Sequence, residues 1–147
     1  MNRSLIFRAY LFLGVLEAAA AMAAFFFVLQ RGGWEYGRLL GPSDPLYLQA
    51  TTACLSAIIV MQVMNVFLCR DDRTSSFRFG FFGNPLILWG IVTEVTLTLL
   101  IDYTPWGNLI FGTAPLDRAL WFFLIPFACA MFALEELRKW VVRKRPR

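Results

Sequence analysis

Four long apolar stretches constrain the fold of this chain more than any other feature of the sequence. They cover residues 6–29, 47–69, 85–101 and 119–142. An α-helix needs about 20 apolar residues to cross a hydrocarbon core of about 30 Å. Loops that contain glycine and proline separate the four stretches. We therefore predict an all-α membrane protein, in which residues 1–147 form one bundle of four transmembrane helices.

The composition agrees with a membrane protein. Hydrophobic residues make up 59% of the chain and charged residues 16%, against about 45–50% and about 25% in soluble domains. The first apolar stretch is not followed by a clean signal-peptide cleavage site, so we expect it to be retained as a span. The prediction is an integral, multi-pass protein of the plasma or inner membrane.

The basic residues predict the orientation in the membrane. Eleven of the 14 Lys and Arg residues lie near the two termini or between the second and third stretches, and three lie elsewhere. The positive-inside rule then predicts that both termini are cytoplasmic. A basic tail beside a span is more typical of topology control or contact with anionic lipid than of nucleic-acid binding. We expect lipid, and no nucleic acid, as a partner.

A resident cofactor is not expected. The chain has no histidine, and its three cysteines lack the spacing of a metal site. Zinc and haem sites are therefore improbable.

Strongly polar residues interrupt three of the apolar stretches at similar depth. Glu17, Gln62 and Glu94 each lie about 12–15 Å along the helix from the expected cytoplasmic edge, and Asn65 follows Gln62 by one turn. If these faces point inward, the groups share one polar pocket. Hard cations such as Na⁺, K⁺ and Ca²⁺ favour carboxylate, amide and hydroxyl oxygens. We therefore predict Glu94, Gln62 and Asn65 as cation-path residues, and leave the role of the buried acid Glu17 open.

Structural roles compete with this interpretation. Gln62 and Asn65 are also suited to hydrogen bonding between helices. Glu17 precedes four alanines that favour close helix packing, so a protonated, hydrogen-bonded acid is an alternative there. Glu94 is harder to explain structurally, because a carboxylate in mid-membrane needs a partner or a proton.

Other acids lie near the ends of the stretches. Asp102 is expected to be solvated at the non-cytoplasmic end of its span. At the cytoplasmic end of the last span, we expect Glu135 and Glu136, with Arg138 and Lys139, to form local ion pairs or to dock a neighbouring loop rather than to bind an ion.

Several motifs together resemble a known family. Residues 60–65 (Val-Met-Gln-Val-Met-Asn), followed by Cys69-Arg70, resemble the eighth helix of P-type cation-transporting ATPases of the calcium and sodium/potassium type. Residues 84–90 with Thr93-Glu94 resemble the ninth helix, and residues 132–139 resemble the end of the tenth. Residues 8–14 with Glu17 resemble the seventh. The resemblance covers almost the whole chain.

The resemblance implies a place beside an ion path. In sodium pumps the eighth and ninth helices help to form a sodium site, and Gln62, Asn65 and Glu94 fall at or beside its liganding positions. Asn65 stands where sodium pumps carry a carboxylate, and Gln62 where calcium pumps carry one. The Asp-Lys-Thr-Gly-Thr phosphorylation motif of the family is absent from this sequence, as is a Gly-rich phosphate loop. The chain is therefore not expected to be an enzyme on its own.

Three functions stay open from the sequence. The first is the support bundle of a P-type pump, as a fragment or split subunit whose partner is a larger ATPase chain. The second is a stand-alone scaffold or regulator derived from that domain. The third is a small four-helix proton-coupled multidrug exporter, against which the strong charge bias argues.

Overall fold

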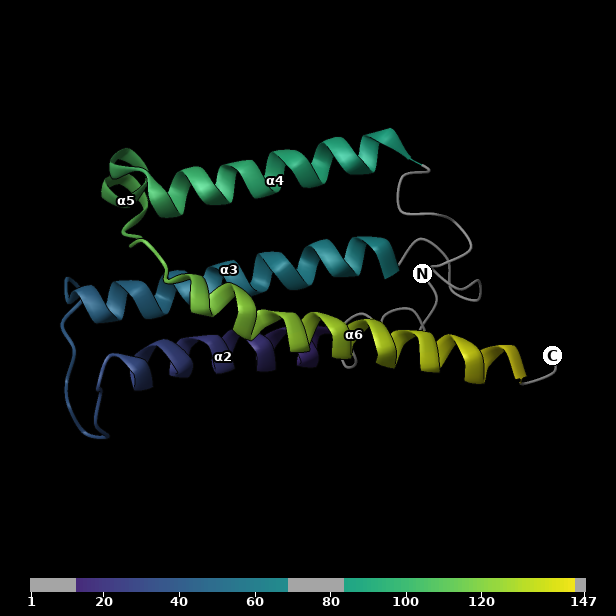
Figure 1. Cartoon of the computed structure of the whole chain (residues 1–147), viewed down its shortest axis with the longest axis horizontal. Coiled ribbons are helices and arrows are strands. Elements are labelled where there is room, and N and C mark those ends of the chain that lie inside the picture. The colour runs from purple at the N-terminus through teal and green to yellow at the C-terminus, as the bar shows by residue number, and fades with distance from the viewer. Residues whose placement is uncertain (1–12, 69–83, 145–147) are drawn as a thin grey trace.

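The computed structural model of the chain describes residues 13–68 and 84–144, and within these ranges it contains five helices and no strand. Four of them are long (Figure 1). Their bounds are α2 Gly14–Arg31, α3 Pro45–Leu68, α4 Pro85–Tyr103 and α6 Arg118–Lys144; the short α5 spans Pro105–Phe111.

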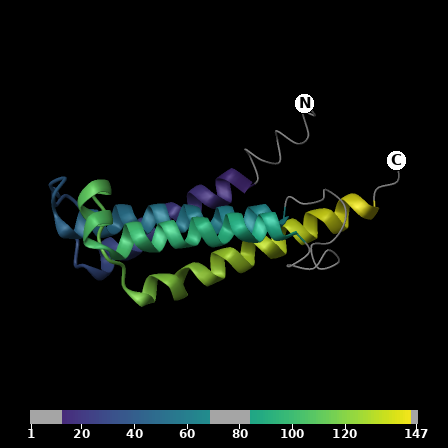
Figure 2. The ribbon, with the colours of Figure 1, turned by 90° about the horizontal axis from the view of Figure 1, so that it is seen from above.

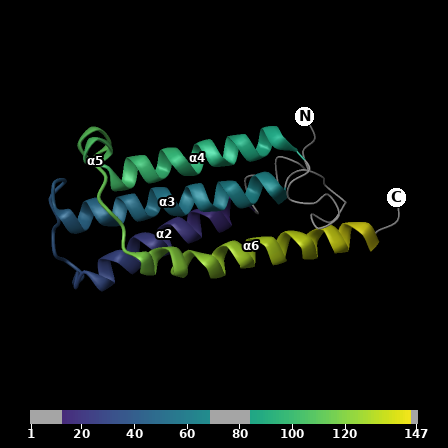
Figure 3. The same cartoon turned by 45° about the horizontal axis from the view of Figure 1, so that its top comes forward.

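The four long helices lie side by side and alternate in direction, as Figures 1 and 3 show. Each is long and apolar enough to cross a membrane, which confirms the predicted all-α bundle with four spans. The observed bounds agree with the predicted ones to about two residues, except that residues 6–12 and Cys69 lie outside the described part. The start of α2 and the end of α6 point the same way along the bundle, and α6 continues well beyond the start of α2, as Figures 1 and 2 show. Their cytoplasmic placement stays a prediction.

Small residues form the contact between α2 and α3. Ala20, Ala21 and Ala24 of α2 are buried, as are Ala53 and Ala57 of α3. Alanine side chains let two helix backbones approach closely, which is how spans associate in a medium as apolar as their own side chains.

Helix α6 completes a three-helix core with larger side chains. Leu120, Leu124 and Met131 are buried against α2 and α3. The rings of Phe27 and Phe123 stack with centroids 4.1 Å apart. The helix continues through Pro126 without interruption.

Helix α4 lies outside this core. It packs mainly against α3 and α5, and Figure 1 shows it as the outermost long helix. Only Thr98 and Asp102 of its 19 residues are buried. Large apolar side chains such as Leu86 and Trp89 are exposed, as expected for a helix face that contacts lipid or a neighbouring protein.

Helix α5 was not expected, because Pro105 and Gly107 indicated a loop. The Thr104 hydroxyl accepts a hydrogen bond from the Gly107 N–H at 3.1 Å, so it caps the helix start. Pro105 occupies the first turn, where proline is tolerated because its missing N–H would be unpaired anyway. The helix ends at Gly112, whose φ of 64° is left-handed. We call the end of the bundle that carries α5 the α5 end.

Candidate functional site

The structure brings the three predicted cation-path residues together. Gln62 and Asn65 of α3, Glu94 of α4 and Val66 line an open groove of about 360 Å³. Residues three apart lie on one helix face, which explains why α3 presents both amides to the same groove. The sequence-based grouping of these residues is thus observed, whereas cation binding stays a prediction.

Glu17 approaches the same groove from α2. Its half-buried carboxyl lies beside the Gln62 side chain. Gln62 therefore stands between the α2 acid and the α3–α4 groove. The role of Glu17 stays open.

The groove opens outward from the bundle. Gln62 is exposed, and Asn65 and Glu94 are only half-buried. The four helices of this chain therefore do not enclose the polar groups. Because exposed amides and carboxylates are costly inside a membrane, the groove presents a polar surface that calls for further polar contacts.

The groove supplies part of a cation coordination shell. It offers one carboxylate and two amide oxygens, whereas Ca²⁺ takes six to eight oxygen ligands. No cluster of three His, Cys, Asp or Glu residues occurs in the described ranges 13–68 and 84–144. The nearby hydroxyls of Thr93 and Thr98 donate to backbone carbonyls of their own helix. A complete site would need ligands beyond these residues.

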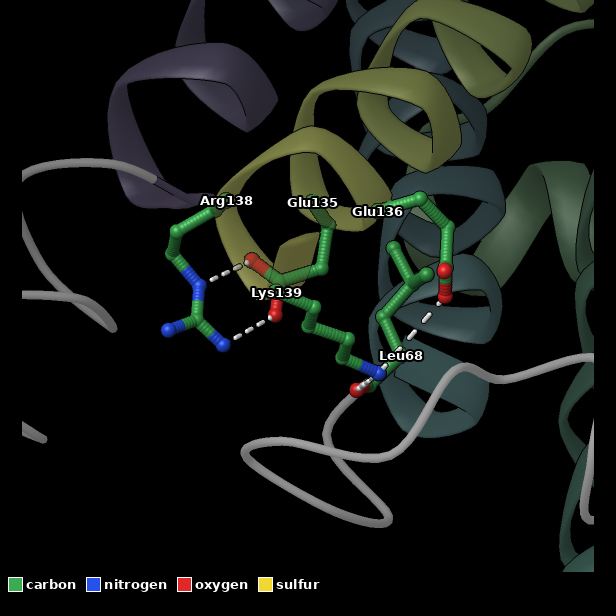
Figure 4. A network of polar contacts seen from close by, with 5 residues as sticks. All are labelled: Leu68, Glu135, Glu136, Arg138 and Lys139. Carbon is green, nitrogen blue, oxygen red and sulfur yellow. Dashed lines mark hydrogen bonds and ion pairs between the residues drawn. The ribbon is translucent and has the colours of Figure 1, made fainter. Parts of the chain in front are cut away.

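The acidic pair at the end of α6 forms ion pairs, as predicted (Figure 4). The Arg138 guanidinium donates to both carboxylate oxygens of the buried Glu135, at 2.9 and 2.8 Å. Bidentate ion pairs between arginine and a carboxylate are among the strongest hydrogen-bonded contacts in proteins. The Lys139 ammonium lies 3.9 Å from Glu136 Oε1.

Lys139 also joins two helices. Its Nζ is buried and donates to the Leu68 carbonyl at 2.9 Å. The contact joins the α6 ammonium to the backbone of α3. Leu68 lies one turn beyond Asn65, so this contact fixes the part of α3 that carries the groove amides. The sequence did not reveal it, because the two residues are far apart in the chain.

The expectation for Asp102 is wrong. Its side chain is not solvated but fully buried, and its Oδ2 accepts a hydrogen bond from the Ser56 hydroxyl at 2.7 Å. Nothing in the pattern of α4 indicates this contact, because Ser56 is 46 residues away and reads as one of many small residues of α3.

Fold and groove together define a class: a multi-span membrane bundle with a polar groove on its outer face. The family model described as "Cation transporting ATPase, C-terminus" matches residues 1–141, and the chain belongs to this family. The resemblance seen in the motifs is thereby confirmed.

The relatives are pump subunits. The chain is 26% identical over 170 aligned positions to the sodium/potassium-transporting ATPase subunit alpha-2 of Gallus gallus, covering 99% of this chain and 17% of that protein. It is 25% identical to the alpha-1 subunit of Catostomus commersonii and to the human alpha-3 subunit, with 99% of this chain and 16% and 17% of those proteins covered. The chain thus spans about one-sixth of the length of these relatives. Their match does not favour a multidrug exporter.

Proposed function

We propose that this chain is the membrane support bundle of a P-type cation pump and lines one side of its cation path. The outward-opening groove of Gln62, Asn65 and Glu94 carries the proposal. A polar groove on the outside of a membrane bundle is best explained by further helices that cover it. In the relatives, the remaining five-sixths of the subunit is where such helices would come from.

The groove is better suited to a monovalent cation than to Ca²⁺. One carboxylate with two neutral amides gives a low negative charge, and hard divalent ions require more oxygen ligands and more charge. The relatives are named as sodium/potassium-transporting ATPase subunits. Sodium and potassium are both monovalent cations, so the names agree with this preference. Partner helices would supply the missing ligands, with Glu17 beside Gln62 behind the groove.

The chain does not hydrolyse ATP in this proposal. Phosphoryl transfer requires groups that position the phosphates and a metal ion, and the match covers only the carboxyl-terminal membrane part of the relatives. The catalytic step belongs to the larger chain with which the bundle assembles.

The proposal predicts that Glu94→Gln lowers the apparent cation affinity of the assembled pump. Loss of one charged ligand costs about 1.5–3 kcal/mol, which corresponds to about tenfold or more in affinity. The measurement is the cation dependence of ATP hydrolysis in native membranes. Glu35→Gln is the matched control, because Glu35 is an exposed acid in the connection between α2 and α3 and should leave the affinity unchanged.

A pull-down from the same membranes tests assembly. The proposal is supported if the bundle is recovered together with a larger ATPase chain or as a segment of one. A chain that is recovered alone would instead support the role of a stand-alone scaffold. Recovery of the pump with unchanged affinity for Glu94→Gln would keep the support role and remove Glu94 from the cation path.

A further inference from the structure

A fully buried acid, Asp102, lies about two turns beyond Glu94 along α4, at the α5 end. The Asp102 side chain has no exposed surface. Its Oδ2 accepts from the Ser56 hydroxyl at 2.7 Å, and its Oδ1 is buried without any hydrogen-bond partner. Buried polar atoms are almost always paired, so this orphan oxygen calls for an explanation.

The groups around Asp102 are neutral. Ser56 faces it from α3, Asn108 from α5 and Thr113 from the following connection; in one amide orientation Asn108 donates to the Asp102 backbone carbonyl at 3.0 Å. The Thr113 hydroxyl donates to the neighbouring Ile101 carbonyl at 2.6 Å. From α6, Trp121 donates to the Tyr103 hydroxyl at 2.9 Å.

The charged residues at this end are engaged or exposed. Arg31 pairs with Asp117 at 3.4 Å, Asp44 accepts from the Leu46 N–H at the start of α3, and Arg118 is exposed at the start of α6. None of the ion pairs in the described residues includes Asp102. An ionised Asp102 would thus be a buried charge without a counter-charge.

The space beside Ser56 offers little polar solvation for such a charge. Ser56 also lines a cavity of about 330 Å³ between α3 and α4, together with Thr98, the indole of Trp121 and six aliphatic or methionine side chains. This half-open, mainly apolar space offers a water molecule few polar partners, and Asp102 itself does not line it. The same lining lacks the several oxygens that a metal cation requires.

We propose that Asp102 is a proton-binding site whose proton locks α4 onto α3. In the protonated acid the observed hydrogen bond reverses: the Ser56 hydroxyl rotates and its oxygen accepts from Oδ2–H across the same 2.7 Å contact. The remaining Oδ1 is then a neutral carbonyl oxygen, which is far less costly to bury than a charge. Loss of the proton leaves a buried carboxylate at the only buried polar link between α3 and α4 in the described residues. Such a site links proton binding to the packing of the outermost span.

The sign of the pH dependence follows from this linkage. The packed form binds a proton that the separated form, with Asp102 in water, releases. Packing is therefore favoured at low pH and weakened as the pH rises.

Asp102→Asn tests the site in the full chain, reconstituted in lipid nanodiscs at fixed salt. Asparagine has the size of the protonated acid and can make the same hydrogen bond without titrating. Between about pH 6 and about pH 9, the wild-type melting temperature should fall by several degrees more than that of Asp102→Asn. Glu35→Gln, the exposed acid at the same end, should follow the wild type.

Infrared difference spectra give a direct readout of the proton. At neutral pH the wild type should show a carbonyl stretch of a protonated carboxylic acid that Asp102→Asn lacks and Glu35→Gln retains. Ser56→Ala should shift the frequency of that band, because it removes the hydrogen-bond partner of the Asp102 carboxyl. If Asp102→Asn does not fold, this frequency shift assigns the band to Asp102 instead.

Several results would overturn the proposal. The first is an infrared band that is unchanged in both Asp102→Asn and Ser56→Ala. The second is an equal pH dependence of the melting temperature in the wild type and in Asp102→Asn. The third is a wild-type melting temperature that rises with Na⁺ or K⁺ at fixed pH, with no such rise in Asp102→Asn. The last result would assign a cation to Asp102 instead. The outcome is independent of the groove, because Glu94 is retained throughout.

Discussion

The three-helix core and the outer helix α4 are held by different forces. Helices α2, α3 and α6 bury alanines, leucines and methionines in two clusters, one toward each end of the bundle. Helix α4 buries only Thr98 and Asp102, both near the α5 end. The core is thus joined along its length by packing, and α4 is attached at one end by polar contacts.

This difference explains where the groove lies. The groove lies between the core helix α3 and the loosely attached α4, about two turns along α4 from the buried Asp102. A small shift of α4 changes the distance from Glu94 to the α3 amides, whereas the amides themselves are fixed by the core. The position of α4 is therefore the variable that a neighbouring chain can set.

The largest effect is expected when the α3–α6 joint of the core is broken. Lys139→Met removes a buried ammonium that donates to the Leu68 carbonyl and lies 3.9 Å from Glu136. Losing a buried hydrogen bond to a charged group costs about 1.5–3 kcal/mol, and the nearby Glu136 loses its neighbouring cation as well. Unfolding in detergent, followed by circular dichroism, measures the loss.

Lys144→Met is the matched control. Lys144 is exposed on the same helix and contacts the Trp140 ring at 3.7 Å, so its loss should have little effect. Equal destabilisation by the two variants would show that burial of Lys139 does not hold the core together.

A smaller effect is expected at the alanine contact between α2 and α3. Ala24 is buried and Ala18 is exposed on the same helix. Ala24→Leu overfills a close helix contact and should cost about 1–3 kcal/mol, whereas Ala18→Leu places the same side chain outside the packed face. The same unfolding assay compares them, and a neutral Ala24→Leu would mean that the core is not closely packed there.

The sequence predicted the spans well because their physical signal is local. Twenty apolar residues must cross the membrane as a helix whatever their neighbours are. Gln62, Asn65 and Glu94 could be grouped because depth in a membrane acts as a shared coordinate for helices that alternate in direction. The outward opening of the groove could not be read in this way, because depth does not give the rotation of a helix about its axis.

The features that were missed depend on tertiary contacts. Asp102 at the end of an apolar stretch reads as solvated unless Ser56 of another helix is known to cover it. Helix α5 was missed because Pro105 both breaks and begins helices, and the Thr104 cap that decides between the two becomes visible only in the structure. The ion pair of Lys139 with Glu136 was predicted correctly, because the two residues are three apart on one helix. The contact of Lys139 with Leu68 could not be predicted, because it joins two helices that are distant in the sequence.

The smallest effect is expected where α4 is attached. Thr104→Val keeps the shape of the side chain but removes the hydroxyl that accepts from the Gly107 N–H at 3.1 Å, and loss of such a cap costs about 1 kcal/mol. Because α5 makes few other contacts, the loss should appear as local opening: faster amide exchange in α5 and the end of α4, with unchanged exchange in α2 and α3. Thr93→Val removes a hydroxyl that donates only to the Trp89 carbonyl of its own helix and should leave α5 unchanged. If Thr104→Val instead accelerated exchange along the α2–α3 contact, the core and α4 would unfold as one unit, and the distinction between a packed core and an outer helix attached at one end would fail.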